Sequence, residues 1–422
     1  MCPGSSGPGS MTRVGPVPTT QVFVPSSVNG PGLGARTQTM PSIGHHDGSE
    51  GSSLPMGDTT ADGRAVAELL RARIARQGPI TFAAFMDAAL YGEGGFYGRR
   101  AVGERGDFVT APHVSPVFGI LLAAQVEEFW RLLDEPDPFS IVEAGAGDGT
   151  LARQVMDALP DAVRRRSTYL AVDRSPTARA ALRAEGLRAA ASVSELPAAR
   201  HGCLLANELL DNLPFHRLRM TDDGPAELYV RVDGDGFELV QGPLSEPGLA
   251  DLVPAELSVG LEWPARPAAT RFLDEAIRAI ARGYVWLADY ALSGAEEAPS
   301  VHGYRAHRLE TDVLSEPGSR DITAGVDFAS LARHASGRGL AVWGPVSQRD
   351  ALLALGFRDL DRRAQQRQVE AVAARRGIDA LRIYSNRARA NLLLARGGLG
   401  DFSVMCVGIG VEREPASTSS TL

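Results

Sequence analysis

The first regular pattern in the chain is a helical recurrence of apolar residues that begins after Asp62. Because these residues return every three or four positions, each stretch places its apolar side chains on one face of a helix. The recurring positions are Val66, Leu69, Leu70 and Ile74, then Phe82, Phe85, Met86, Ala89 and Leu90, and finally the apolar-faced stretch from Pro116 to Leu133. We therefore expect residues 61–138 to form an N-terminal helical layer.

From residue 139 onward, short apolar stretches alternate with helical ones. Strands are predicted at 139–144, 168–172, 203–206, 284–290, 340–343 and 402–409, with a short one near 187, and helices at 150–159 and 176–185. Strands separated by helices at this spacing are typical of a parallel sheet that is covered on both faces. The predicted fold class is α/β, a doubly wound Rossmann-like sheet.

A different pattern interrupts this alternation. Residues 218–240 alternate between polar and apolar around two Asp-Gly turns, which predicts an antiparallel hairpin. We assign 218–265 to this inserted hairpin, a substrate region, which divides the core into a first half, 139–217, and a second half, 266–411. The arginine-rich stretch 360–394 has helical spacing and is interpreted as a solvated helix face.

The two ends of the chain lack such patterns. Residues 1–60 are rich in Gly, Pro, Ser and Thr and hold few large apolar side chains, so burial cannot offset their ordering entropy. We expect 1–60 to be a disordered, low-complexity N-terminus and 412–422 to be a disordered tail.

Composition narrows the class of protein. The net charge is −8, which argues against a nucleic-acid partner, and no run of eighteen apolar residues predicts a membrane span. Three scattered cysteines suit neither a disulfide framework nor a metal site, and indicate a reducing compartment. We expect a cytoplasmic protein without a metal. All 43 basic residues are arginine, which suggests a GC-rich bacterial genome.

The strongest chemical signal is the glycine-rich turn from Glu143 to Thr150, placed between a strand and a helix. Glycines let the backbone approach a ligand and expose the amides of a helix N-terminus, as dinucleotides and S-adenosylmethionine both require. A dinucleotide fingerprint begun at Gly145 would need glycine or alanine where Thr150 stands. The spacing favours S-adenosylmethionine, bound by Gly145, Gly147 and Gly149.

Acidic residues near this turn agree with that cofactor. Asp173 closes the next strand, where a carboxylate can accept both ribose hydroxyls. Glu143 lies just before the turn, near the cationic aminoacyl end of the donor. These features together indicate a class I methyltransferase rather than a nicotinamide oxidoreductase.

A second acidic motif, Asn207-Glu208-Leu-Leu-Asp211, follows the strand at 203–206. Glu208 and Asp211 lie three residues apart and could hold a guanidinium, hydroxyl or amine in line with the methyl group. Alternatively they cap a helix N-terminus, where Asn207 and acids are favoured. We take Glu208 and Asp211 as the candidate catalytic pair and Asn207 as a donor ligand.

The chain resembles the MidA family of methyltransferases. The similar segments are 91–97, 106–112, 143–150, 206–214, 304–307, 317–318, 321–328 and 348–356, and they lie in the family's order. That family includes a mitochondrial arginine methyltransferase needed for assembly of respiratory complex I. The resemblance implies that an arginine of a partner protein, such as a respiratory-complex subunit, is methylated, with Phe108 and Thr110 closing over the donor.

Two departures from the family pattern leave the acceptor open. His113 stands where the family usually has glutamate, and Asn212 where it usually has alanine. His113 is either a proton acceptor or a hydrogen-bonded structural histidine. The alternatives are a small molecule or peptide acceptor from a biosynthetic pathway, and a noncatalytic assembly factor that binds the donor. Oligomeric state does not follow from the sequence.

Overall fold

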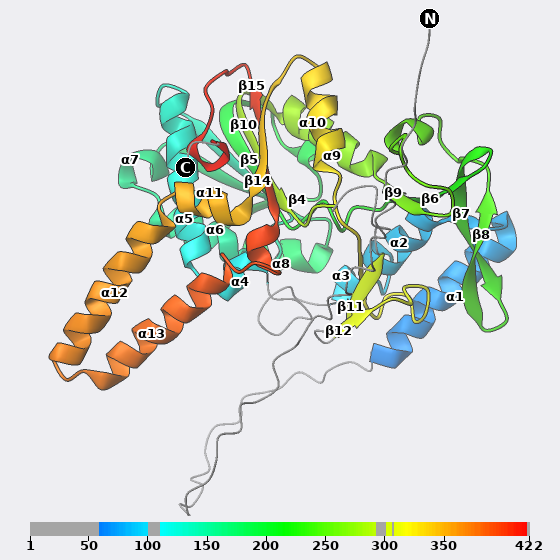
Figure 1. Ribbon diagram of the computed structural model, residues 1–422, viewed down its shortest axis with the longest axis horizontal. Coiled ribbons are helices and arrows are strands. Elements are labelled where there is room, and N and C mark those ends of the chain that lie inside the picture. Colours follow the sequence, from blue (N-terminus) through cyan, green and yellow to red (C-terminus); the bar gives the residue numbers. More distant parts are fainter. Residues whose placement is uncertain (1–58, 100–109, 293–300, 306–307, 420–422) are drawn as a thin grey trace, which may run out of the picture. The chain divides into compact units, whose positions relative to one another are not determined.

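A seven-stranded sheet forms the centre of the computed structural model, which describes residues 59–99, 110–292, 301–305 and 308–419 (Figure 1). Its strands are, in spatial order, β14 (Ala341–Ser347), β15 (Ser403–Ile409), β10 (Ile280–Asp289), β5 (Ala199–Asn207), β2 (Phe139–Ala144), β3 (Ser167–Val172) and β4 (Arg188–Ala190). Strands β10, β5, β2, β3 and β4 pair in parallel, whereas β15 is antiparallel to both its neighbours.

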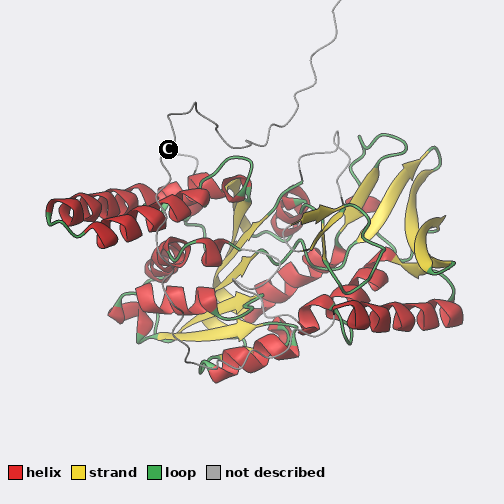
Figure 2. Ribbon diagram, turned by 90° about the horizontal axis from the view of Figure 1, so that it is seen from below, coloured by secondary structure: helices red, strands yellow, loops and turns green. Residues whose placement is uncertain are grey.

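The central strands are buried on both faces, which explains their nearly continuous apolar sequences. On β5, Cys203 and Leu205 face one core while Leu204 and Ala206 face the other. The first face packs against α5 (Val117–Leu132), α6 (Thr150–Ala158) and α11 (Gln348–Ala354), and the second against α9 (Pro267–Ala279) and α10 (Phe328–Gly337). Figure 2 shows helices on both sides of the sheet, which confirms the predicted doubly wound α/β class. The short helix α7 (Asp161–Arg164) precedes β3, and α8 (Pro176–Ala184) follows it.

The predicted N-terminal layer is divided between two cores. Helices α1 (Thr59–Gln77) and α2 (Phe82–Tyr91) pack with Phe215, just before the inserted region, and with Val230 inside it, whereas α5 packs on the central sheet. The reason is that the short strand β1 (Ile80–Thr81) pairs with the insertion and draws its flanking helices there. Helices α3 (Phe96–Arg99) and α4 (Ala111–Val114) lie in between along the chain.

The inserted region is a sheet larger than the expected hairpin. Strands β6 (His216–Thr221), β7 (Gly224–Asp233), β8 (Gly236–Gly242) and β9 (Glu262–Ala265) join β1 in a five-stranded antiparallel sheet. A further three-stranded sheet, which the sequence did not predict, consists of β11 (His302–Arg305), β12 (Arg308–Glu310) and β13 (Asp321–Thr323). Strands of three or four residues are too short to show a period.

The C-terminal part adds detail to one expectation and differs from another. The arginine-rich stretch is two helices that pack side by side, α12 (Phe357–Ala373) and α13 (Gly377–Leu392) (Figure 1). The expected disordered tail instead contains the 3-10 helix Ala416–Thr418, whose Ser417 and Thr418 are buried. The amide of Ala416 donates to Glu128 on α5 at 3.0 Å, which fastens this segment. Residues 1–58 and 420–422 lie outside the described residues. None of the described helices is both long and apolar enough to span a membrane.

Candidate active site

Four acidic residues lie near the carboxyl ends of neighbouring strands in the central sheet. Glu143 is the fifth residue of β2, Asp173 follows β3, Glu208 follows β5 and Asp289 ends β10. The strand order reverses between β2 and β5, since β3 lies beyond β2 and β10 lies beyond β5. In open α/β sheets this reversal forms a crevice at the carboxyl ends of the strands, where ligands bind.

The glycine turn is fixed against the end of β3. The amides of Gly145 and Ala146 donate to the carbonyl of Val172 at 2.8 and 3.1 Å, and the amide of Gly147 donates to Asp173 Oδ2 at 2.9 Å. Gly145 and Gly147 have φ angles of 76° and 54°, in the left-handed region where glycine is favoured. At Gly145, an added Cβ would also approach Leu209 to 3.1 Å.

Glu143 is buried beneath this turn. Its Oε2 accepts a hydrogen bond from the hydroxyl of Tyr169 at 2.8 Å. Burial raises the pKa of Glu143 to about 8, with the nearby carboxylates of Asp173 and Asp148 adding to the rise and the Tyr169 hydroxyl opposing it. A cationic group placed beside Glu143 would therefore favour its charged form.

Glu208 stands at the end of β5 in an uncommon backbone conformation. Its φ angle is 52°, a left-handed value that is strained for a glutamate and that tends to occur at functional sites. Its amide donates to the carbonyl of Ala288 at 2.9 Å, and its Oε1 accepts hydrogen bonds from the Ala111 amide and the Asn207 side chain, both at 2.9 Å. Burial raises the pKa of Glu208 to about 7.

The loop that follows Glu208 is held from two sides. Asp289 Oδ2 accepts hydrogen bonds from the amides of Leu209, Leu210 and Asp211 at 2.7–3.2 Å. The buried guanidinium of Arg266 donates to the carbonyls of Leu210, Asp211, Leu213, Ala324 and Gly325. Buried side chains therefore accept hydrogen bonds from the N–H groups of this loop and donate to its carbonyls. These bonds fix the loop backbone and thereby the direction of the side chains that the loop carries.

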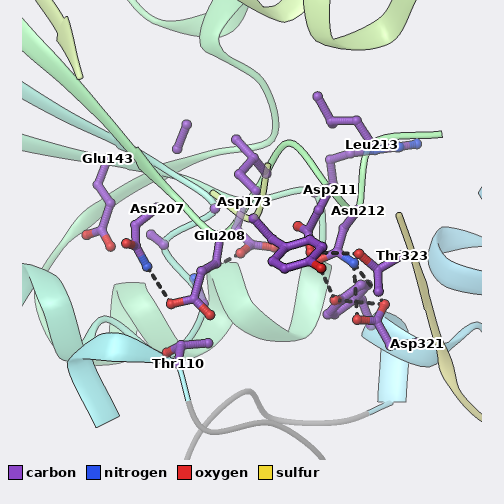
Figure 3. Close-up of a pocket in the computed structure, with 18 of the residues that line it drawn as sticks. Thr110, Glu143, Asp173, Asn207, Glu208, Asp211, Asn212, Leu213, Asp321 and Thr323 are labelled. Carbon is purple, nitrogen blue, oxygen red and sulfur yellow. Dashed lines mark hydrogen bonds between the residues drawn. The ribbon is translucent and has the colours of Figure 1, made fainter. Parts of the chain in front are cut away.

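Asp211 also lines this crevice. Its Oδ2 accepts a hydrogen bond from the hydroxyl of Thr323 at 2.8 Å, while its buried Oδ1 has no hydrogen-bond partner among the described residues. The neighbouring Asp321 accepts hydrogen bonds from Tyr97 and Asn212 (Figure 3). Burial raises the pKa of Asp321 to about 8, and the charge of Asp211 adds to this rise.

His113 has both ring nitrogens engaged. Nδ1 lies 2.8 Å from Thr110 Oγ1 and Nε2 lies 3.1 Å from Asp148 Oδ2. His113 thereby links α4 to the glycine turn, which is the role of a hydrogen-bonded structural histidine. Phe108, expected to close over the donor with Thr110, lies outside the described residues.

One cavity of about 1140 Å³ brings most of the predicted site residues together. Its lining includes Thr110, Glu143, Gly145, Gly147, Asp173, Asn207, Glu208 and Asp211. Gly149 is not among them, because it is the N-cap of α6 and an added Cβ there would approach Leu182 rather than the cavity. Figure 3 shows the acids along this cavity, with Glu143 and Asn207 at one end and Asp321 and Thr323 at the other.

Several of the important residues escaped the sequence prediction. Tyr97, Asn212, Asp321 and Thr323 line the same cavity, and Asp289 and Arg266 hold its loop. Asp289 could have been found, because it ends a predicted strand as Asp173 does. Arg266 and Asp321 come from short elements far along the chain, and no periodic pattern marks them.

The cavity fits S-adenosylmethionine at the Glu143 end. Glu143 can accept a hydrogen bond from the amino group of the donor. Asp173 accepts hydrogen bonds from two backbone amides and still has lone pairs for the ribose hydroxyls. The buried Oδ1 of Asn207, also without a partner among the described residues, is a further acceptor. Across residues 59–99, 110–292, 301–305 and 308–419, no cluster of His, Cys, Asp and Glu suits a metal ion. The sheet and this donor site define a class I S-adenosylmethionine-dependent methyltransferase.

Comparison with known proteins identifies the family. Residues 121–346 match the family model Methyltransf_28, an S-adenosyl-L-methionine-dependent methyltransferase family. The chain belongs to this family, which comprises the MidA-like methyltransferases, and uses S-adenosylmethionine as its methyl donor.

Curated relatives and solved structures agree with this assignment. The chain is 30% identical to the mitochondrial protein arginine methyltransferase NDUFAF7 of Mus musculus, over 73% of this chain and 78% of that protein. It is 31% identical to the homolog of Drosophila melanogaster, over 67% and 73%. A methyltransferase-family crystal structure from Burkholderia thailandensis, bound to S-adenosyl-homocysteine, has a TM-score of 0.74 and 27% identity, covering 87% of this chain and 98% of that one.

Proposed function

We propose that this methyltransferase transfers the methyl group to an arginine side chain of a partner protein. The observation that carries the proposal is the acidic acceptor end of the cavity. Glu208, Asp211 and Asp321 line it, and among the described residues none of them forms an ion pair with an arginine. The names of the curated relatives, which are protein arginine methyltransferases, support the same substrate class.

The proposed roles follow from the contacts of each residue. Bound S-adenosylmethionine supplies a methyl group that is open to direct displacement. A guanidinium nitrogen forms a bond to the methyl carbon as the bond from that carbon to sulfur breaks, and the nitrogen then loses one proton. Glu208 is held in the cavity by hydrogen bonds from Ala111 and Asn207, and its pKa of about 7 suits a group that accepts this proton at neutral pH.

Positioning is the second contribution of the chain. Asp211 Oδ1 is a buried acceptor that can hold one side of a guanidinium, and Asp289 and Arg266 keep the Asp211 backbone in place. Phe96 and Leu213, together with Tyr290, supply apolar lining that excludes water from the reacting groups. These roles require no metal.

The test is a labelling experiment. Purified enzyme is incubated with methyl-labelled S-adenosylmethionine and a lysate from a strain that lacks this protein, and proteins are separated from metabolites. We expect label on arginine in a protein, and a respiratory-complex subunit is the partner that we propose. Label only in the small-molecule fraction would favour the biosynthetic alternative, and absence of label despite donor binding would favour a noncatalytic assembly factor.

We also propose a reducing compartment, the cytoplasm, as the location. Cys203 and Cys406 are free and buried, which supports a fold that does not depend on disulfides. Since the curated relatives are mitochondrial proteins by name, cell fractionation with antibody detection is the decisive measurement.

A further inference from the structure

A second carboxylate lies at the acceptor end of the cavity, at the start of β13. Asp321 Oδ1 is 3.1 Å from the hydroxyl of Tyr97, and both of its carboxylate oxygens accept from the side-chain amide of Asn212, at 3.0 and 3.1 Å (Figure 3). Asp321 and Asn212 are 3% and 8% exposed. Asp321 is therefore a fixed, buried acid rather than a solvated one.

The orientation of Asn212 is set by two tyrosines. The Tyr97 hydroxyl lies 2.9 Å from Asn212 Oδ1, and the Tyr91 hydroxyl donates to the Asn212 carbonyl at 3.2 Å. The two tyrosine rings stack on each other with centroids 5.4 Å apart. Because Asn212 Oδ1 faces Tyr97, its NH₂ group faces Asp321, where it stabilises the charged form.

Asp211 and Asp321 face the same space. Thr323 donates its hydroxyl to Asp211, and it lies two residues after Asp321 on β13. Residues two apart on a strand point to the same face, so Asp321 is the neighbour of Thr323 on the Asp211 side. The charge of Asp211 raises the pKa of Asp321, which agrees with this proximity.

Among the described residues, Asp211 and Asp321 have no cation paired with them. The titratable groups that face it are Tyr91, Tyr97 and Asp211, with His302 opposite Thr323 on β11 lining the same cavity. No described arginine forms an ion pair with Asp211 or Asp321: Arg266 donates to backbone carbonyls, although its charge opposes the rise of the Asp211 pKa, and Arg320 contacts Glu310. Asp211 Oδ1 is buried without a partner among the described residues. Without a cation these buried acids hold protons more tightly, as the raised pKa of Asp321 shows, and a cationic ligand would favour their charged forms.

We propose that Asp211 and Asp321 form a two-carboxylate subsite for a guanidinium, and that Asn212, by donating to Asp321, is a specificity-determining residue that favours the charged form of Asp321 when a cation binds. A guanidinium is planar and presents five N–H donors in several directions, so it can contact carboxylates on two sides, whereas a compact ammonium cannot do so equally well. This inference rests on the proposed function, because it names the residues that select an arginine.

The test uses small probes, so that it does not depend on turnover. Binding of ethylguanidinium, n-butylammonium and the neutral isostere ethylurea is measured by ligand-observed NMR on the full-length protein saturated with S-adenosyl-homocysteine. We expect ethylguanidinium to bind best and ethylurea least. Asp321→Asn and Asp211→Asn should each weaken ethylguanidinium binding by about tenfold or more, since each removes a charge-assisted hydrogen bond.

Asn212→Ala separates the specificity role from the carboxylates themselves. Without its amide, Asp321 loses two hydrogen bonds that favour its charged form, so it should hold its proton to a higher pH than in the unsubstituted protein. We expect Asn212→Ala to reduce the preference for ethylguanidinium over ethylurea, and raising the pH should restore that preference. Asp321→Asn should show no such recovery.

Matched controls make the outcome decisive. Glu275→Gln alters another acid that lines the cavity, on α9, and should leave probe binding unchanged. Equal binding of ethylurea and ethylguanidinium, or an Asp321→Asn protein that folds and binds the probe normally, would overturn the proposal. If the probes behave as expected while no protein arginine is labelled, the subsite stands and the protein-substrate proposal fails alone.

Discussion

The amide of Gly147 donates to Asp173 Oδ2 at 2.9 Å, so the donor turn and the acid expected to bind ribose are joined directly. The other carboxylate oxygen of Asp173 accepts from the amide of Ser175 at 2.8 Å. Burial raises the pKa of Asp173, and these two amides oppose that rise. Asp173 therefore shapes the turn as well as offering lone pairs to a ligand.

Gly147→Val should abolish binding of S-adenosyl-homocysteine without unfolding the protein. A branched side chain at a φ angle of 54° is strained, and it would occupy the space where backbone approaches the ligand. We expect the dissociation constant, measured by calorimetry, to rise at least about 100-fold. Gly186→Val is the matched control, because Gly186 also has a positive φ but lies in open space. Normal donor binding by Gly147→Val would refute the turn assignment.

Asp173→Ala should weaken donor binding by about 1–3 kcal/mol, the usual loss for a charged hydrogen-bond acceptor. The loss has two sources, since the ribose acceptor and the partner of the Gly147 amide disappear together. Asp173→Asn retains one carbonyl oxygen and should lose less. Calorimetric titrations of both variants, with thermal melting as a check on folding, decide whether they differ in this order.

Glu208→Gln should lower kcat by about 10²–10⁴-fold while leaving donor affinity nearly unchanged, because the carboxylate is proposed to accept the proton of the acceptor. In the unsubstituted enzyme only charged Glu208 accepts a proton, so kcat should fall as the pH drops below about 7 and level off above it. Steady-state rates between about pH 6 and 9 would show this fall in kcat at low pH, and the Glu208→Gln variant should lack it.

Asp211→Asn is expected to keep donor affinity and to raise KM for the acceptor more than it lowers kcat, since Asp211 is assigned to acceptor binding. Equal losses of donor affinity in Asp173→Ala, Glu208→Gln and Asp211→Asn would show that the last two acids are structural caps. Titration of all three with S-adenosyl-homocysteine makes that comparison.

Glu143 should make the protein without ligand less stable as the pH rises. Burial raises its pKa from 4.5 to about 8, so the folded state binds the proton more tightly than the unfolded state does. This stabilisation is complete below about pH 4.5 and is lost as the pH passes through about 8, with a slope of up to about 1.4 kcal/mol per pH unit. Urea unfolding at about pH 6 and about pH 8.5 should show a smaller difference for Glu143→Gln than for the unsubstituted protein.

Arg266→Met should reduce the free energy of unfolding by about 3–5 kcal/mol, because it leaves buried carbonyls of the 210–213 loop and of residues 324–325 without a donor. Urea denaturation monitored by circular dichroism measures the loss. Arg271→Met is the matched control on α9, the helix that begins just after Arg266, since the Arg271 side chain is 60% exposed and should change stability little. A small effect at Arg266 would contradict the role given to its guanidinium.

The sequence predicted the central strands well because they depend on local patterns of apolar residues, whereas the residues assigned to donor binding stay a prediction. The predicted strand at 139–144 coincides with β2, and the acids at the ends of β2, β3 and β5 do line one cavity. At the proposed acceptor end, Glu208 and Asp211 were among the predicted residues, whereas Tyr97, Asp321 and Thr323 were not, because they come from distant segments. Tyr97, Asn212 and Asp321 meet only through the three-stranded sheet, whose strands are too short to show a period.

The predicted segments differ from the structure where tertiary contacts, rather than local composition, decide how a segment packs. The polar tail was expected to be disordered, yet Ser417 and Thr418 are buried, since the Ala416 amide finds an acceptor on α5. The N-terminal helices were grouped with α5 because all three are amphipathic. Amphipathic spacing shows that a helix has a partner but does not show which sheet that partner belongs to.

The way Asp289 and Arg266 hold the Glu208 loop has a consequence for evolution and engineering. Because these two side chains form hydrogen bonds with main-chain groups, the path of the loop depends little on the side chains that the loop itself carries. Natural drift or a mutant library can therefore exchange residue 212 and its neighbours while the backbone stays in place. A search for altered acceptor range should begin with saturation at that position, in a background that keeps Asp289 and Arg266.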